Sequence, residues 1–274
     1  FFDLIIDYQL VVLGTHVIIS SGPTLFNGLP DHPFWLPTPF EKVLDDYNLD
    51  GKLRILVFGA LEKVEIALRT QIIYQYSLVH GGNWFEDSQH FRDQKHFKKD
   101  LANLDRELDR SNEVFIKHYK SKYTSPVRPP AWMTLEVSTL GTLSKMYENL
   151  RLTAEKKAIS QHFGLGHPFL LESWARCFNH VRNHCAHHGR LWNRPLTLVP
   201  ILPNTVSMPW IDGHFLKEPH KIFSTLCCIR FFLNRINPGN TFHLELKSLL
   251  AAFPNTNRQT MGFQNGWENE PLWQ

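Results

Sequence analysis

Residues 50–82 read DGKLRILVFGALEKVEIALRTQIIYQYSLVHGG. Apolar residues recur at every third or fourth position of this stretch, and charged residues are interleaved between them. This spacing is typical of an amphipathic helix that buries one face. We therefore predict a long helix over about residues 50–79, which ends at the Gly81-Gly82 pair because glycine disfavours continuation of a helix.

Shorter helical patterns follow along the chain. Residues 86–122 are dense in charges of both signs and predict one or two helices with a solvated face, before a rigid break at Pro126, Pro129 and Pro130. We expect Gly189 to follow the last residue of one later helix, as glycine often does. The further predicted helices cover residues 132–149, 153–163, 167–188, 215–236 and 241–252, so the predicted fold class is mainly α.

The two ends of the chain show other patterns. Residues 4–20 are rich in Ile, Val and Leu without helical spacing and look strand-like, whereas residues 21–40 carry five prolines and two glycines and predict a loop. Residues 195–209 predict a proline-rich extended connection, and residues 254–274 an ordered loop. We divide the chain into an N-terminal segment, 1–40, and a helical domain, 41–274.

Composition excludes several classes of protein. The 274 residues are 43% hydrophobic and 20% charged, so the chain can bury a core and is not disordered overall. Its four cysteines contain no CxxC pair, which predicts reduced thiols in a cytosol. The apolar run 4–19 is broken by Asp7, Gln9 and His16 and has no basic leader, so we expect neither a membrane span nor a signal peptide.

Charge is distributed unevenly along the chain. The formal net charge is only +3, but no Asp or Glu occurs between Glu172 and Asp212. That acid-free segment suits an anionic ligand. It contains Arg176, Arg182, Arg190 and Arg194 together with His180, His184, His187 and His188.

These residue types suit metal-free cleavage of RNA. A nuclease that depends on Mg²⁺ needs carboxylates to hold the ion, and the acid-free segment has none. In RNA the neighbouring 2′-hydroxyl can attack the phosphate, which requires a base, an acid and a cation for the crowded phosphorus. Histidine can serve as base or acid near neutral pH, and arginine grips phosphate with two parallel donors.

Residues 178–194, FNHVRNHCAHHGRLWNR, carry a family resemblance. Arg182-Asn183-x-x-x-His187 is the R-x4-H pattern of HEPN ribonucleases, and the wider string resembles the signature of abortive-infection proteins of the AbiD/AbiF type. The resemblance covers about residues 41–274, while residues 1–40 lack the Asn-Tyr-Tyr-Arg-like segment expected there. Other segments agree in order: LDGKLR (49–54), ALEKVEIALRT (60–70), PPAW (129–132), GTLSKMY (141–147) and the tail from 261 to 273.

The resemblance implies an all-helical, HEPN-like bundle with RNA as its substrate. It further implies a metal-independent endoribonuclease that leaves a 2′,3′-cyclic phosphate and needs no cofactor. Such a protein would act as a toxin in phage defence in the bacterial cytoplasm, restrained by a protein or RNA antitoxin. The resemblance makes Arg182 and His187 the catalytic pair. Supporting or RNA-contacting residues would be Asn183, His184, His188, Arg190, Asn193, Glu65 and Arg69.

Helical geometry adds an argument for a homodimer. Arg182 and His187 lie about 140° apart around a regular helix, so they do not share a narrow face. They converge only if the helix unwinds near Gly189, if the arginine reaches far, or if a partner chain contributes. A single family-matching histidine also leaves the reaction one proton-transfer group short, and a two-fold axis would supply the second.

Several alternatives remain open at this stage. Glu65 and Arg69 either form a plain surface ion pair or place Glu65 across the bundle to hold Arg182. Leu191 and Trp192 anchor the loop, unless Trp192 stacks on a base, and Cys185 is a small core residue. The basic helix could also bind RNA or a partner without cutting it. A zinc site is the further alternative, with Cys177, His180, His184 and either His187 or His188 on one helix.

Overall fold

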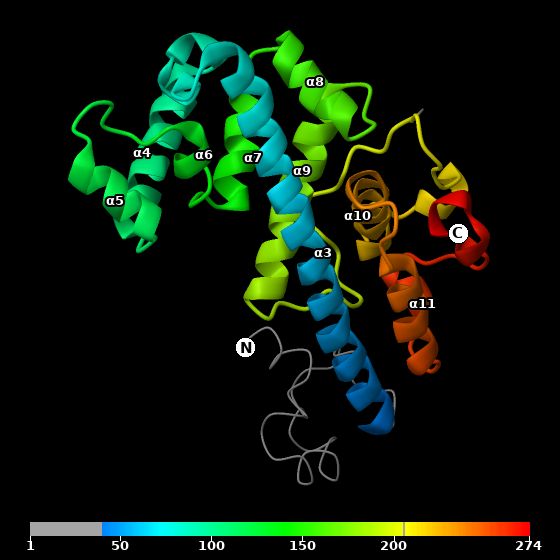
Figure 1. The fold of residues 1–274 in the computed structure, drawn as a ribbon. Helices are drawn as coiled ribbons and strands as arrows, with labels where there is room; N and C mark the ends of the chain where they lie inside the picture. Colours follow the sequence, from blue (N-terminus) through cyan, green and yellow to red (C-terminus); the bar gives the residue numbers. More distant parts are fainter. Residues whose placement is uncertain (1–39, 205) are drawn as a thin grey trace, which may run out of the picture.

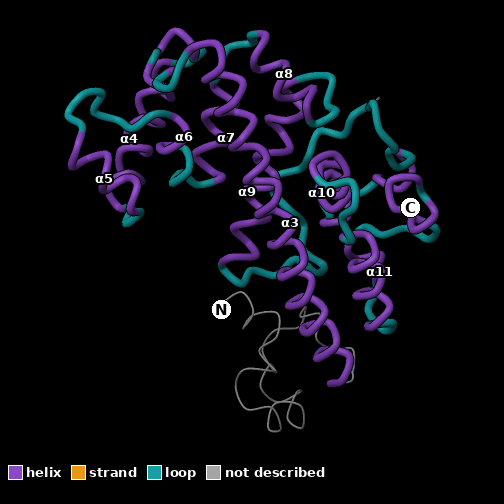
Figure 2. Tube along the Cα trace, viewed as in Figure 1, coloured by secondary structure: helices purple, strands orange, loops and turns teal. Residues whose placement is uncertain are grey.

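The computed structural model describes residues 40–204 and 206–274, and this part is mainly helical without a strand (Figures 1 and 2). The predicted mainly α class is therefore confirmed. The predicted strand-like run 4–20 and the loop 21–40 lie outside the described residues, apart from Phe40. No helix in the described part is long and apolar enough to cross a membrane.

The longest helix, α3 (Phe40–His80), contains the predicted helix 50–79 and begins ten residues before it. Burial explains the extension, because Asp46 and Leu49 already face the interior. The helix ends where predicted, since Gly81 adopts the left-handed conformation with φ 79°.

The remaining helices follow the predicted order with two differences. The predicted helix 132–149 is two helices, because the Thr139 side chain accepts a hydrogen bond from the Thr142 amide (3.2 Å) and starts a new one. The start of the predicted helix 215–236 is instead a short 3₁₀ turn, Gly213–Leu216. The helices are α4 (Gln94–Arg110), α5 (Val114–Lys122), α6 (Ala131–Thr134), α7 (Leu140–Asn149), α8 (Ala154–His162), α9 (Pro168–Ala186), α10 (Ile222–Ile236) and α11 (Phe242–Ala252).

Helix α3 forms the centre of the bundle and contacts α7, α8, α9, α10 and α11 (Figure 1). Its core stripe, which includes Leu53, Val57 and Leu61, is fully buried. Burial of each such side chain stabilises the fold by about 1.5–3 kcal/mol. The predicted packing of the 167–188 helix against the 50–79 helix is confirmed, because α9 lies along α3.

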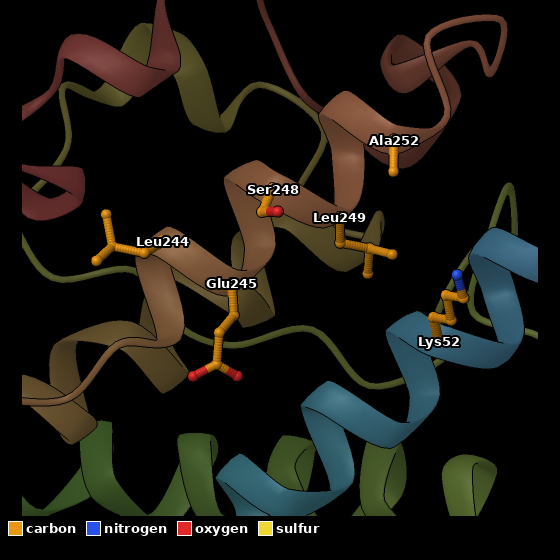
Figure 3. A pocket seen from close by; sticks show the side chains of 6 residues that line it. All are labelled: Lys52, Leu244, Glu245, Ser248, Leu249 and Ala252. Atoms are coloured by element: carbon orange, nitrogen blue, oxygen red, sulfur yellow. The ribbon is translucent and has the colours of Figure 1, made fainter.

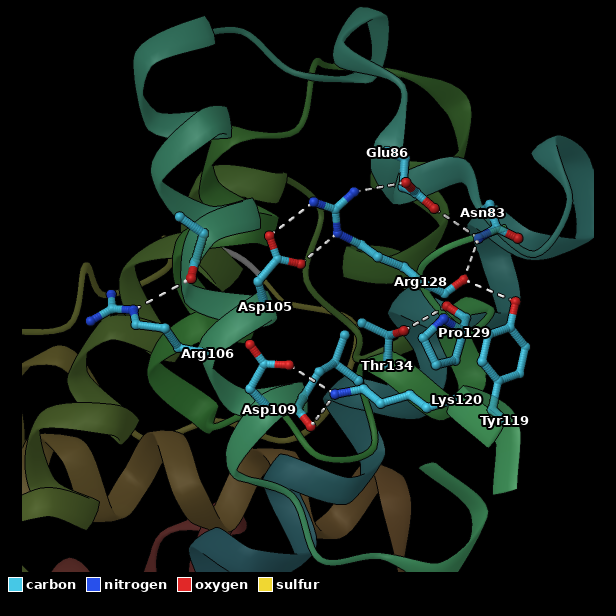
Figure 4. Close-up of polar contacts among 12 residues, drawn as sticks. Asn83, Glu86, Asp105, Arg106, Asp109, Tyr119, Lys120, Arg128, Pro129 and Thr134 are labelled. Atoms are coloured by element: carbon cyan, nitrogen blue, oxygen red, sulfur yellow. Dashed lines mark hydrogen bonds and ion pairs between the residues drawn. The ribbon is translucent and has the colours of Figure 1, made fainter. Parts of the chain in front are cut away.

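Helices α4 and α5 lie at one edge of the bundle, where α4 packs against α7 (Figure 1). Arg128 contributes polar contacts there (Figure 4). The Arg128 guanidinium donates to both carboxylate oxygens of Asp105 at 2.7 and 2.9 Å, and to Glu86 at 2.8 Å. Tyr119 donates to the Pro126 carbonyl at 2.9 Å. These contacts tie the segment after α5 to α4 and to the turn after α3.

The C-terminal tail is ordered, as predicted for residues 254–274. It consists of short 3₁₀ turns whose aromatic side chains return to α10. Phe223 of α10 packs against Phe263 at a ring-centroid distance of 4.5 Å and against Trp267 at 5.6 Å. Trp267 and Trp273 are nearly completely buried, so the tail is part of the core.

Candidate functional site

Helix α9 carries the residues of the predicted site. Proline is well suited to its first position, Pro168, because the first amides of a helix need no partner within it. Trp174, Phe178 and Val181 form its buried face, whereas Asn183 is exposed on the opposite side. The polar end of α9 is therefore presented by a helix that is firmly anchored in the core.

The C-terminus of α9 is a Schellman turn. His187 is the C-cap residue, and His188 follows in the left-handed conformation with φ 57°. The Gly189 amide donates to the His184 carbonyl at 2.7 Å, and the His188 amide donates to the Cys185 carbonyl at 3.2 Å. The turn presents His187 and His188 to solvent.

We expected Gly189 to be the first residue after the C-cap of the helix, but that residue is His188, one position earlier. The left-handed residue is His188, and glycine at 189 serves close packing instead. A Cβ atom at 189 would lie 2.8 Å from Nδ1 of His184 and 3.3 Å from its carbonyl oxygen. Position 188 therefore needs a residue that tolerates a left-handed backbone, whereas position 189 needs a residue without a Cβ atom.

Replacing His188 with glycine is expected to raise the free energy of unfolding by about 0.5–1 kcal/mol, because glycine adopts a left-handed backbone without strain. Replacing Gly189 with alanine should lower it, since the new Cβ meets His184. Urea denaturation of both variants beside the native protein measures the two changes. Equal or lower stability of His188→Gly would contradict the assigned turn.

Arg182 lies on the side of α9 that faces α3. Its side chain is half-buried, and Cζ lies 5.5 Å from the centre of the Phe58 ring. This is a cation–π contact, which leaves the guanidinium charged and limits where its donors can point. Sequence analysis did not identify Phe58, because it belongs to the apolar run of α3.

Glu65 and Arg69 pair with each other, as the simpler interpretation predicts, but the pair is largely buried and not on the surface. Arg69 donates to Glu65 at 2.8 Å and to the Ser138 carbonyl at 3.0 Å. Glu65 lies seven residues beyond Phe58 on α3, which is roughly 10 Å along the helix axis. The structure therefore places this pair at the connection between α6 and α7, away from Arg182.

Asp50 is a site residue that sequence analysis missed, although it lies within the segment LDGKLR. Its carboxylate accepts hydrogen bonds from the backbone amides of Leu191 at 2.8 Å and Trp192 at 2.7 Å. It also forms an ion pair with Arg54. Burial raises the pKa of Asp50, against the opposing effect of these hydrogen bonds and of Arg54. Asp50 thus fixes the loop after α9 onto α3.

The anchoring roles predicted for the loop and the core agree with this geometry. Leu191 is fully buried, and Trp192 is partly buried against the core. Cys185 is buried as well, and burial raises the pKa of its thiol to about 12. A thiol with such a pKa stays protonated at neutral pH and behaves as a small apolar residue.

His180 and His184 are in contact one turn apart on α9. Their Nε2 atoms lie 3.2 Å apart, and Nε2 of His180 also lies 3.2 Å from the Thr197 hydroxyl. Desolvation lowers the pKa of His180, and the nearby Arg194 adds to that effect. His184, which was predicted as a supporting residue or, in the alternative, a zinc ligand, is therefore one member of a pair.

The remaining predicted residues lie around the same end of α9. Arg190 and Asn193 are half-buried in the following loop, where Asn193 has a φ of 47°. Arg190 is near enough to Asp50 to act on it electrostatically. The pair Glu65 and Arg69 lies on α3 instead, apart from the rest. The other predicted residues all belong to the last turns of α9 or to the loop that follows it, but they point in different directions. They are Arg182, Asn183, His184, His187, His188, Arg190 and Asn193.

The zinc alternative requires Cys177 and several histidines to converge. Within residues 40–204 and 206–274, no three His, Cys, Asp or Glu side chains are grouped so that they could hold a metal ion. Cys177 is buried, which raises the pKa of its thiol to about 12. Burial thus disfavours the thiolate form in which cysteine binds zinc.

A surface groove lies between α3 and α11, away from the predicted residues (Figure 3). It has a volume of about 490 Å³ and is open to solvent. Lys52 borders it on α3, and Leu244, Glu245 and Leu249 border it on α11. None of the predicted site residues lines this groove.

Comparison with known proteins gives one family. The family model described as Abi-like protein matches residues 25–193. The match contains α3 to α9, the turn at residues 187–189 and every predicted site residue. It also begins within the N-terminal segment and ends before the tail. No curated protein and no solved structure matches the chain.

Proposed function

The chain belongs to the family of Abi-like proteins, and from this premise we propose that it is an endoribonuclease of abortive infection. Family membership points to defence against phage. The finer proposal is a toxin with an HEPN-type centre that cuts RNA without a metal ion. The observation that supports this proposal is that α9 holds the half-buried Arg182 and ends in a turn that exposes His187.

In the proposed reaction, His187 takes the proton of a 2′-hydroxyl, and the resulting oxygen attacks the adjacent phosphorus. Arg182 stabilises the negative charge on the non-bridging oxygens. The bond between phosphorus and the 5′-oxygen breaks, and that oxygen receives a proton from a second acid. The products are a 2′,3′-cyclic phosphate and a free 5′-hydroxyl.

The second acid is proposed to be His187 of another copy of the chain. Arg182 faces α3 while His187 is exposed on the turn, so one chain does not present both groups on a narrow face. A two-fold axis beside the exposed end of α9 would place two arginines and two histidines together. We expect light scattering to show a dimer at micromolar concentration.

A binder without catalysis is the second candidate, and the same separation of Arg182 from His187 favours it. The deciding experiment incubates end-labelled RNA with the purified protein in excess EDTA. We expect cleavage that leaves a cyclic phosphate, and no cleavage where a single 2′-deoxynucleotide replaces the scissile position. RNA that is bound but not cut would favour the binder, and loss of cleavage in EDTA would contradict the metal-free mechanism.

A further inference from the structure

Backbone hydrogen bonds to the end of α9 shape the turn that presents His187. The His187 amide donates to the Asn183 carbonyl at 2.9 Å, and the amides of His188 and Gly189 bond to the carbonyls of Cys185 and His184. All of these acceptors belong to the last turn of α9. The position of His187 therefore depends on how well that last helical turn is fixed.

The side chain of His184 supports this turn from inside. A Cβ atom at position 189 would be 2.8 Å from its Nδ1 atom, so the imidazole packs directly against Gly189. A change in the rotamer of His184 would open space beneath the turn or press against it. The orientation of this one ring thus bears on the placement of His187.

His180 fixes that orientation from the opposite nitrogen. The Nε2 atoms of His180 and His184 lie 3.2 Å apart, and the rings meet edge to face with centroids 4.5 Å apart. His180 is in turn held by the Thr197 hydroxyl at 3.2 Å. Nε2 of His180 thus links the loop to His184, and the close packing of His184 against Gly189 links His184 to the turn.

The charges around His180 are compatible with this contact. A hydrogen bond between two imidazole nitrogens needs one N–H and one lone pair, so at least one ring must be neutral. Arg194 in the loop disfavours a charge on His180. Arg176, one turn earlier on α9, is instead paired with Glu148 of α7 at 3.2 Å.

We propose that His180 is a positioning residue for the ribonuclease reaction, acting through His184 on the turn that carries His187. This inference rests on the proposed function for its catalytic consequence, but its structural part does not. His180 itself contacts His184 and Thr197 and takes no part in the proton transfers. Sequence analysis considered His180 as part of the basic, acid-free segment and as a zinc ligand, not as a positioning residue.

Two substitutions separate positioning from mere folding. His180→Ala removes both polar contacts, which the native side chain makes through the single atom Nε2. In His180→Gln the two N–H groups of the amide can donate to His184 and to the Thr197 hydroxyl. We expect His180→Ala to lower kcat about 10–100-fold with little change in KM, because a small displacement of a reacting group is costly. His180→Gln should recover most of that loss. His167→Ala, at the far end of α9, is the matched control and should keep native kinetics.

A second measurement needs no RNA. Exchange of the Gly189 amide, read by NMR, should become about three- to tenfold faster in His180→Ala and near native in His180→Gln. Equal exchange in all three proteins would overturn the proposal even if RNA is cut. Equal loss of kcat in both variants would overturn it as well. If the native protein cuts no RNA, the proposed function fails, and the exchange data still decide whether His180 holds the turn.

Discussion

Arg182→Ala and His187→Ala are each expected to slow RNA cleavage by about 10²–10⁴-fold, the usual effect of removing a charge-stabilising donor or a proton-transfer group. Both variants should stay folded. His187 is exposed, and the half-buried contact of Arg182 with Phe58 contributes about 0.5–2 kcal/mol, which is small beside the stability of a domain. Single-turnover cleavage of labelled RNA measures the rate, and circular dichroism checks the fold.

Two further variants sharpen this prediction. Arg182→Lys should recover little activity, because a point charge does not reproduce the planar fork of donors. Arg176→Ala is the matched control, since Arg176 is an exposed arginine on the same helix that pairs with Glu148. A near-native rate for His187→Ala would reject the mechanism. So would cleavage of DNA, which lacks the attacking hydroxyl.

The helices could be predicted because the residues that a helix buries on one face recur at every third or fourth position of the sequence. The core stripe of α3 and the end of the helix at Gly81 follow from local spacing alone. Helix α7 begins at a cap made by the Thr139 side chain. The apolar residues around Thr139 keep a helical spacing, so the sequence pattern alone predicts one continuous helix there. Such boundaries depend on local hydrogen bonds that the hydrophobic period does not encode.

The candidate site could be predicted only where its residues are neighbours in sequence. Arg182, His184 and His187 were identified from one string on α9. Asp50 could not be placed in this way, because its partners Leu191 and Trp192 are 141 and 142 positions away. The crowding at Gly189 likewise comes from the side chain and backbone of His184, whose positions only the folded chain defines.

Asp50→Ala is expected to lower the free energy of unfolding by about 3–5 kcal/mol, because it leaves Arg54 without its buried partner and two backbone amides without an acceptor. The Leu191 amide belongs to a residue that is fully buried, so water cannot easily replace the carboxylate. The loop after α9 should then detach from α3, and RNA cleavage should fall together with stability.

Asp50→Asn is the matched control, because the amide oxygen can still accept from the Leu191 and Trp192 amides while the charge opposite Arg54 is lost. We expect it to cost about 1–3 kcal/mol, which lies between the native protein and Asp50→Ala. Urea denaturation followed by tryptophan fluorescence measures the stability of all three proteins. If Asp50→Ala proves as stable as the native protein, the carboxylate does not hold the loop. Some other contact would then have to keep Arg190 near position 50.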